Sequence, residues 1–144
     1  MSEATAIIAV LDDEPDRVQV MRRQLSKRLA NYEHVFFDNA PDLIEWLVRQ
    51  LNNCALICLD HDLGPNRIRD GQTFDPGTGR DVADYLSGCR PQCPIVIHTT
   101  NADAAPGMER VLQESGWQTI RVIPFDDLAW IRGWWIREIQ AALR

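Results

Sequence analysis

Short runs of apolar residues alternate with longer amphipathic segments along the chain. A continuous apolar run bounded by polar loops is typical of a strand in a parallel sheet that is buried on both faces, whereas apolar residues at helical spacing predict amphipathic helices. The runs predict strands over residues 7–11, 34–37, 54–59, 94–98 and 119–123. The segments between and after the runs predict helices over residues 16–30, 41–51, 79–86, 106–115 and 128–143.

The order of these elements predicts a single α/β domain. Parallel neighbours need crossover connections, which are usually helical, so strands that alternate with helices indicate a doubly wound parallel sheet. A chain of 144 residues is long enough for one buried core and too short for two ordinary domains, so we expect one domain over residues 1–144. In such a sheet the ligand site lies at the carboxyl ends of the strands.

Charge and hydropathy limit the classes of partner. The formal net charge of −6 argues against a broad nucleic-acid surface and against binding to anionic membranes. No segment approaches the ~18 consecutive apolar residues of a membrane span, and the first residues lack the basic stretch of a signal peptide. We therefore expect a cytoplasmic protein that has no membrane partner.

The cysteines occur as two pairs, Cys54 with Cys58 and Cys89 with Cys93. Cys54 and Cys58 lie in one predicted strand, where four residues span ~13 Å, too far for two ligands of one zinc ion. We therefore expect buried, reduced thiols rather than a metal site.

Polar residues follow three of the predicted strands directly. Asp12 and Asp13 follow the first strand, Asp60 follows the third, and Thr99 follows the fourth. Three ionised carboxylates at close range need a counter-charge, because like charges raise one another's pKa, and a hard divalent cation such as Mg²⁺ or Mn²⁺ supplies it. We expect a metal site at Asp12, Asp13 and Asp60. The alternative is that each acid is a solvated loop residue or a helix cap.

Four segments resemble, in order, the motifs of response-regulator receiver domains. They are IAVLDDEP (residues 8–15), ALICLD (55–60), PIVIHT (94–99) and PF (124–125). The resemblance covers essentially the whole chain and implies a flavodoxin-like, CheY-like fold with strand order 2-1-3-4-5. It also implies that Asp12 and Asp13 hold Mg²⁺. By the same resemblance, Asp60 occupies the phospho-acceptor position and Thr99 supplies the hydroxyl that contacts the phosphoryl group.

Two positions depart from the receiver pattern. Receivers carry a lysine just before the proline that follows the fifth strand, where its ammonium contacts the phosphoryl group, and this position is Ile123 here. The aromatic switch residue three positions earlier is replaced by Ile120. Arg121 lies on the same strand face as Ile123 but ~7 Å farther down, which makes it a poor substitute for the lysine.

Two histidines flank the predicted pocket, His61 beside Asp60 and His98 beside Thr99. Imidazole titrates near neutral pH, so the two rings could act as general base and general acid. A structural role is the alternative for each ring. Because His98 and Thr99 point to opposite faces of a regular strand, we expect the chain to turn near His98 so that both reach the pocket.

Further segments resemble a divergent branch of this superfamily, the cyclic-phosphate-processing receiver domains. They are LDHDLG (residues 59–64), TG (78–79) and HTTN (98–101), together with Met108. The resemblance implies action on cyclic phosphate ends of RNA rather than phosphate relay. It points to Asp60, His61 and His98 as catalytic residues. Substrate or phosphate contacts are expected from Thr99, Asn101 and Asp62.

The loop over residues 64–78 is longer than most loops between a strand and a helix, and it is rich in glycine, proline and charged residues. Long loops of this kind often carry function, so we expect a lid or a substrate-contact element. A disordered insertion is the alternative.

Three functions of different classes fit the sequence. The leading one is metal-assisted chemistry on a phosphate-ester or cyclic-phosphate substrate. The second is a signalling receiver that a histidine kinase phosphorylates on Asp60. The third is a non-catalytic interaction module, in which Trp130, Trp134 and Trp135 form a face on the last helix that is also a candidate homodimer interface. Core packing is the alternative role of these tryptophans.

Overall fold

A computed structural model describes residues 6–144 and has a five-stranded parallel sheet at its centre. Its strands are β1 (Ile7–Leu11), β2 (Glu33–Phe37), β3 (Cys54–Leu59), β6 (Ile95–Ile97) and β7 (Thr119–Arg121). They lie in the order β2-β1-β3-β6-β7, and every neighbouring pair is parallel. This is the order 2-1-3-4-5 predicted for the five strands, so the flavodoxin-like fold is confirmed.

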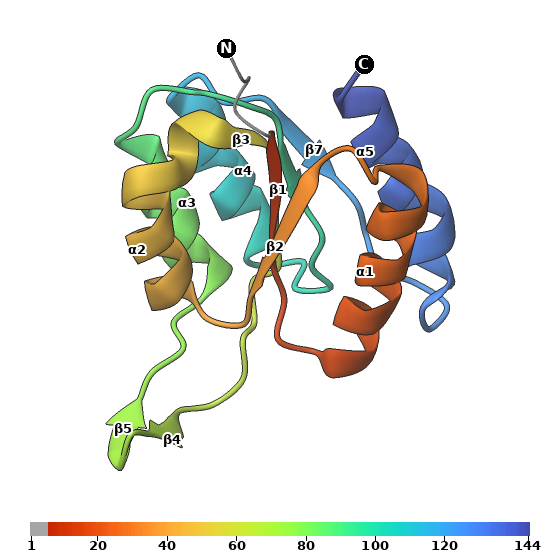
Figure 1. Cartoon of the computed structure of the whole chain (residues 1–144). Coiled ribbons are helices and arrows are strands. Elements are labelled where there is room, and N and C mark those ends of the chain that lie inside the picture. The colour runs from red at the N-terminus through yellow and green to blue at the C-terminus, as the bar shows by residue number, and fades with distance from the viewer. Residues whose placement is uncertain (1–5) are drawn as a thin grey trace.

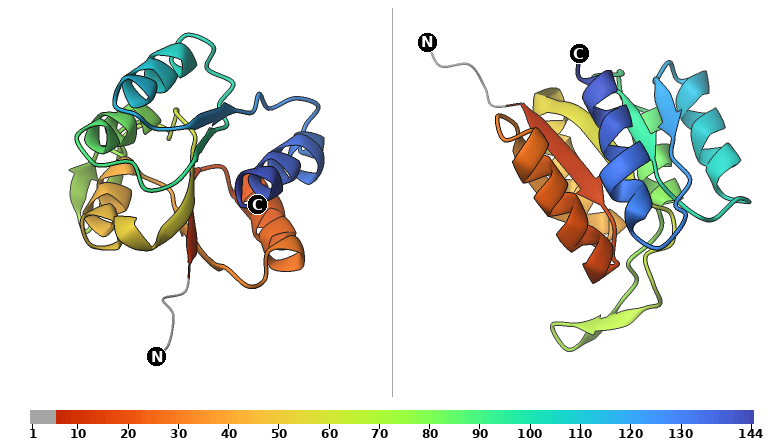
Figure 2. Two further views of the ribbon diagram at one scale, coloured as in Figure 1. Left: turned by 90° about the horizontal axis from the view of Figure 1, so that it is seen from above. Right: turned by 90° about the vertical axis from the view of Figure 1, so that its right-hand side faces the viewer.

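Helices cover both faces of the sheet (Figures 1 and 2). One face carries α1 (Pro15–Arg28) and α5 (Ile136–Ala142), and a short π-helical segment, η2 (Ile131–Trp135), leads directly into α5. The other face carries α2 (Ala40–Gln50), α3 (Gly79–Ser87) and α4 (Ala105–Glu114), with a short 3₁₀ turn, η1 (Leu51–Asn53), after α2. These bounds lie close to the predicted helices. The last helical run begins at Ala129, one residue after its predicted start, and it includes the π-helical turn η2 before α5.

Alternation along the strands divides the core into two layers. Ala9 and Leu11 of β1 pack with the layer of α2, α3 and α4, whereas Ile8 and Val10 pack with the layer of α1 and α5. Both layers are buried, which is why β1 is a continuous apolar run. The same alternation directs Asp12, the next residue of the second row, toward α1 and α5.

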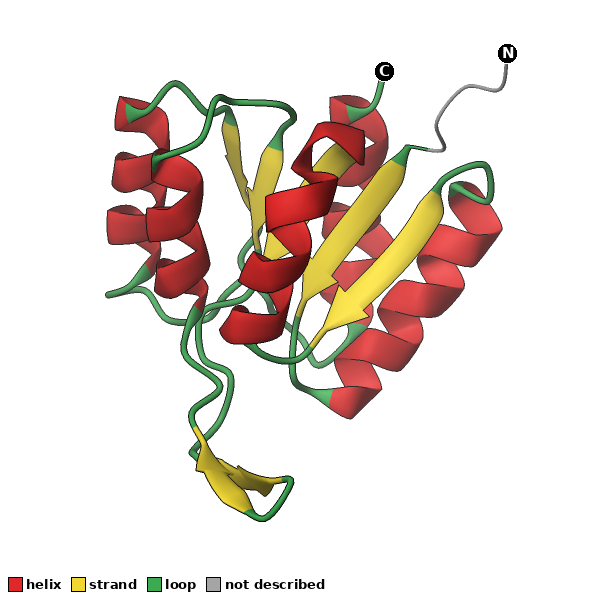
Figure 3. Ribbon diagram, turned by 60° about the vertical axis from the view of Figure 1, so that its left-hand side comes forward, coloured by secondary structure: helices red, strands yellow, loops and turns green. Residues whose placement is uncertain are grey.

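The segment predicted as a long loop contains an ordered antiparallel hairpin. Its strands, β4 (Arg67–Arg69) and β5 (Gln72–Phe74), extend beyond the carboxyl edge of the main sheet (Figure 3). Asp70 and Gly71 form the turn, with φ angles of 53° and 77°. Positive φ at both central residues is the requirement of a type I′ hairpin turn, and Asp-Gly is a sequence that meets it. A disordered insertion is therefore not what the structure contains.

Two of the three tryptophans near the C-terminus belong to the core. Trp130 and Trp135 are buried in the layer of α1 and α5, while Trp134 is only partly buried and lies 6.5 Å from the Phe125 ring. The prediction of an exposed face made of all three rings is therefore wrong. All four cysteines are free, and Cys54 and Cys58 are buried as predicted, whereas Cys89 and Cys93 are only partly buried. Within residues 6–144, no helix is long and apolar enough to span a membrane.

Candidate functional site

Three carboxylates meet at the carboxyl edge of the sheet. In the register of β1 with β3, Leu11 is opposite Leu59, so the next residue of each strand, Asp12 and Asp60, emerges at the same level. One oxygen each from Asp12, Asp13 and Asp60 lies within 4.8 Å of the others. Asp12 and Asp60 are buried, whereas Asp13 is partly exposed. The predicted convergence of these side chains is therefore present in the structure.

The three carboxyl groups differ in their pKa. Burial raises the pKa of Asp60 to about 6, with a further contribution from the negative charge of Asp12, while the charges of His98 and Arg17 oppose the rise. Burial and the charge of Asp12 also raise the pKa of Asp13. Burial acts on Asp12 in the same direction, but the hydrogen bond and charge of His98, with the charge of Arg17, outweigh it and lower the pKa of Asp12. The cluster thus has more negative charge than its neighbours neutralise.

Arg17 lies between two of these carboxylates. Its Nη2 donates to Asp60 Oδ2 over 3.2 Å, and its Nε is 3.4 Å from Asp12 Oδ2. Arg17 is in the first turn of α1, and α1 begins at the same edge of the sheet because Glu14 caps it directly after the two aspartates. Sequence reasoning missed this residue. The available signal was a basic residue placed four and five positions after the two acids, at the start of the following helix.

His98 is buried beneath Asp12 and does not lie in the open part of the site. Its Nε2 donates to Asp12 Oδ2 over 3.0 Å, and neither side chain is exposed. The imidazole packs against the rings of Trp130 and Trp135, at centroid distances of 5.9 and 6.3 Å. The predicted turn near His98 is wrong, because the chain is still paired with the sheet here: His98 N donates to Leu59 O. His98 therefore continues the row of Val96 on the α1 and α5 face.

His61 belongs to a second polar cluster next to Asp60. Its backbone N–H donates to Asp60 Oδ1 over 2.7 Å, and its ring Nδ1 is 2.9 Å from Asp62 Oδ1. Because an ionised carboxylate only accepts, Nδ1 carries the proton and Nε2 is left with the lone pair. Asn101 Nδ2 lies 3.3 Å from both oxygens of Asp62 and 3.4 Å from His61 Nδ1. The cluster holds a half-buried imidazole in a fixed orientation.

The residues at the carboxyl ends of β6 and β7 have distinct roles. Thr99 is buried, and its hydroxyl oxygen accepts from Asn101 N over 3.1 Å, which leaves the hydroxyl proton free to be donated. Arg121 donates to Thr99 O over 2.8 Å and lies 3.7 Å from Glu109 of α4. Ile123, at the position of the receiver lysine, is half exposed. Arg121 is thus engaged below the site rather than in it.

Gly79 sets the distance between α3 and the acidic edge. Its backbone N–H donates to His61 O over 2.9 Å, and a Cβ at this position would lie 1.9 Å from the carbonyl oxygen of Asp60. No other residue type fits such an approach without a backbone shift. The Thr78 side chain and Asp81 form a capping box at the same helix end.

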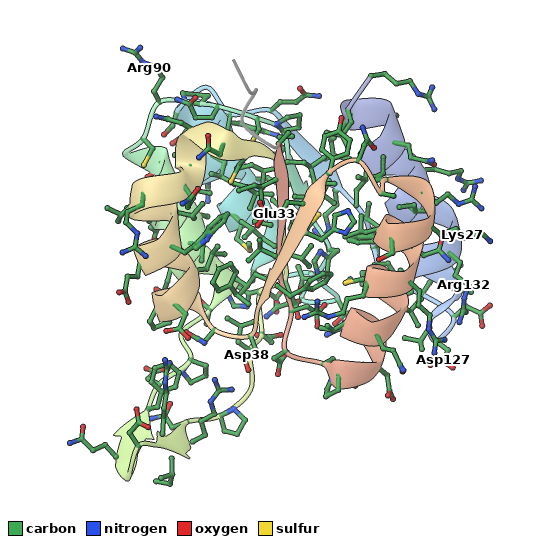
Figure 4. The ribbon with its side chains drawn as sticks, viewed as in Figure 1. Lys27, Glu33, Asp38, Arg90, Asp127 and Arg132 are labelled. Atoms are coloured by element: carbon green, nitrogen blue, oxygen red, sulfur yellow. The ribbon has the colours of Figure 1, made fainter. Side chains whose placement is uncertain are left out.

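Two hollows lie at this edge, one beside Asp12 and Asp13 and one beside Arg17. One of ≈ 380 Å³ is bounded by Asp12, Asp13, the start of α1, the end of β2 and the start of α2. The other, of ≈ 260 Å³, is bounded by Arg17, Thr100, Trp130 and the loop after β7. The hairpin is fixed beside the first hollow, because Arg67 pairs with Asp38 at 2.9 Å and Arg69 with Asp42 at 3.1 Å. Asp38 is labelled in Figure 4, at the end of β2 nearest the hairpin.

Residues 7–114 match the model of the cyclic-phosphate processing receiver domain family. The match includes both acidic strand ends, the hairpin segment and the whole His61–Asn101 region. No curated protein sequence matches the chain.

Solved structures of response-regulator receivers have the same fold. A phosphorylated cyanobacterial phytochrome response regulator, RcpA, is 15% identical, with a TM-score of 0.69 over 95% of this chain and 92% of that one. The Mn²⁺-bound form of the response regulator Rcp1 is 14% identical, with a TM-score of 0.66 over 94% and 92% of the two chains. A receiver domain from Rhodospirillum rubrum is 18% identical, with a TM-score of 0.64 over 96% and 92%. At these identities the likeness shows the fold alone.

Proposed function

The chain belongs to the family of cyclic-phosphate processing receiver domains, and from this premise we propose that it hydrolyses a cyclic phosphate ester at the carboxylate edge. The observation that carries the proposal is the His61–Asp62 pair beside Asp60, since an ordinary phospho-acceptor site does not need an oriented imidazole. The pair provides a base whose Nε2 lone pair is directed by the bond on the opposite nitrogen.

The carboxylates fit a divalent cation. All three offer hard oxygen ligands at mutually close distances, and they carry three charges against the single charge of Arg17. The presence of Mn²⁺ in the similar Rcp1 structure supports the same assignment here, with Mg²⁺ or Mn²⁺ as the ion. When bound to Asp12, Asp13 and Asp60, the ion supplies charge that polarises a phosphoryl oxygen.

The residues of the chain then divide the remaining tasks. His61 Nε2 takes a proton from the attacking water, the water oxygen forms a bond to phosphorus, and one ring P–O bond breaks. The proton returns from His61 to the leaving oxygen, so one water is added to give an open monoester. Thr99 and Asn101 contact the phosphate oxygens. His98 acts as a positioning residue, because it is buried and holds Asp12 rather than facing solvent.

The test is hydrolysis of a nucleoside 2′,3′-cyclic phosphate in the presence of Mg²⁺, followed by ³¹P NMR. We expect turnover by the wild type and a loss of ~10²–10⁴-fold in His61→Gln, the usual contribution of a general base. His34→Gln is the matched control. His34 lies at the start of β2, at the end of the strand far from the site, and its ring bonds to Leu29 O. Absence of turnover in the wild type, or equal turnover in His61→Gln, contradicts the proposal.

A signalling role, with a histidine kinase as partner, makes the opposite prediction. The lysine that contacts the phosphoryl group in ordinary receivers is replaced by Ile123, and Asp60 is buried under Arg17. We therefore expect acetyl phosphate to label Asp60 poorly. Stoichiometric, long-lived labelling of Asp60, detected by intact-protein mass spectrometry, would favour the signalling role over the enzyme.

A further inference from the structure

A phosphate group brought to three carboxylates needs a cation from the protein as well as a metal ion. Phosphate esters carry negative charge, and in phosphoryl-transfer sites lysine or arginine side chains neutralise the charge that develops on their oxygens. Lys27 is the only lysine of the sequence. It lies in the last turn of α1, ten residues beyond Arg17 and therefore ~15 Å along the helix from the site (Figure 4). No lysine of the sequence can therefore reach the three carboxylates.

The arginines near the site differ in their availability. Arg22 borders the ≈ 380 Å³ hollow, but its guanidinium lies over the Phe36 ring at 4.2 Å. Arg121 is committed to Thr99 O and Glu109. Arg67 and Arg69 hold the hairpin to β2 and α2. Arg17, in contrast, is in contact with Asp12 and Asp60 themselves, the two buried carboxylates.

The contacts of Arg17 leave much of its hydrogen-bonding capacity unused. A guanidinium has five N–H donors, and charge-assisted bonds of this kind are usually ~2.7–2.9 Å long. Arg17 makes one bond of 3.2 Å to Asp60, and its Nε is buried without a hydrogen-bond partner among residues 6–144. The side chain is also 19% exposed and borders the ≈ 260 Å³ hollow beside Thr100. It can therefore meet a ligand that enters from this side.

We propose that Arg17 is the phosphate-binding cation of this site. It takes the place of the receiver lysine, whose position is occupied by Ile123 here. The proposal rests on the proposed function in so far as that function brings a phosphate group to the carboxylate edge. Without ligands, Arg17 is the counter-charge of Asp12 and Asp60. A divalent ion takes over that role, and the guanidinium then turns its free donors to the phosphate oxygens.

This double role predicts opposite effects on two ligands. Removing Arg17 takes away a competitor for the carboxylates, so the affinity for Mg²⁺ rises or stays the same. The same change removes a phosphate ligand, so the affinity for phosphate falls. A residue with a merely structural role would weaken the binding of both ligands together.

The experiment is calorimetric titration of the full chain with Mg²⁺ alone, and then with inorganic phosphate at saturating Mg²⁺. We expect Arg17→Gln to weaken phosphate binding by about tenfold or more, the loss of one charge-assisted contact, without weakening Mg²⁺ binding. Arg17→Lys keeps the charge but not the fork of donors, so it retains part of the phosphate affinity, and it serves as the second variant if Arg17→Gln does not fold. Arg23→Gln, an exposed position on the same helix, is the control of equal charge change.

Three results overturn the inference. The first is an unchanged affinity of Arg17→Gln for phosphate. The second is a parallel loss of affinity for Mg²⁺ and for phosphate in this variant. The third is the absence of phosphate binding by the wild type. The outcome is separable from that of the proposed function, because phosphate binding needs no turnover. A wild type that binds phosphate through Arg17 but leaves the cyclic ester intact contradicts the hydrolase and supports the role of Arg17.

Discussion

His98 Nε2 donates to Asp12 Oδ2 over 3.0 Å inside the protein, with neither side chain exposed to solvent. The bond joins the ends of β1 and β6, two strands separated by β3. It gives the buried Asp12 carboxylate one donor that does not depend on a ligand. His98 therefore sets the orientation of Asp12 from the core side, while Arg17 contacts the same carboxylate from α1.

Replacing His98 by leucine should destabilise the protein by about 2–4 kcal/mol, because the Asp12 carboxylate loses a buried hydrogen-bond donor. The loss should be smaller at saturating Mg²⁺, which gives Asp12 a new charge partner. Urea denaturation in chelator and in Mg²⁺ measures both values. Val96→Ala, a change in the same buried row, should cost the same in the two conditions. A His98→Leu cost that is also independent of Mg²⁺ would show that Asp12 is not a ligand.

The stability of the metal-free protein should fall as pH rises through the titration of Asp60. Its pKa is raised to about 6 from the ordinary value of 3.8. The folded state therefore binds more protons than the unfolded state between these values, and stability is lost as pH rises from about 4 to 6. Two pKa units correspond to about 3 kcal/mol as an order of magnitude.

The Asp60→Asn variant tests this relationship in the presence of chelator. Asparagine has no charge to desolvate, so the variant should gain stability relative to the wild type as pH rises from 5 to 7.5. Urea denaturation at the two pH values measures the gain. Asp103→Asn, an exposed position, is the control and should show no such gain. A constant difference between Asp60→Asn and the wild type would mean that Asp60 titrates normally.

Mg²⁺ or Mn²⁺ should bind at Asp12, Asp13 and Asp60 and raise the melting temperature, because it relieves the repulsion among three close carboxylates. Tryptophan fluorescence can follow the titration, since Trp130 borders the hollow that contains Arg17. Asp13→Asn should weaken binding by about tenfold or more, since it removes a charged ligand. Equal binding by the Asp13→Asn, Asp60→Asn double variant would exclude this site.

The hairpin should loosen locally when its anchor is removed. The guanidinium of Arg67 bonds to Asp38 and lowers the pKa of that carboxyl. Both side chains are exposed, so Arg67→Ala should cost at most about 1 kcal/mol of global stability. Hydrogen exchange should nevertheless become faster in residues 67–74. Arg90→Ala, at the opposite end of the molecule in Figure 4, is the control. Unchanged exchange in Arg67→Ala would show that the hairpin is held by other contacts.

The sequence by itself determined the sheet and the acids at its edge. Apolar runs that end abruptly in aspartate fix both the strands and the positions of Asp12, Asp13 and Asp60 along them, since buried strands must be apolar and the first polar residue marks their end. Parallel pairing through helical crossovers then places all these ends on one side. The strand ends differ from the prediction, since β6 and β7 have three residues each although their runs predicted five.

Only the tertiary structure decided which side chains touch. His98 meets Asp12 rather than solvent because the register across three strands puts them on the same face of the sheet, and that register is set by pairing between distant segments. Arg17 reaches Asp60 because α1 begins at the acidic edge, and this depends on how the helix packs against the sheet. The hairpin was not predicted, although Asp70-Gly71 is a hairpin-turn sequence, and its position comes from ion pairs to Asp38 and Asp42. Contacts between residues far apart in sequence are formed by packing, which no local pattern encodes.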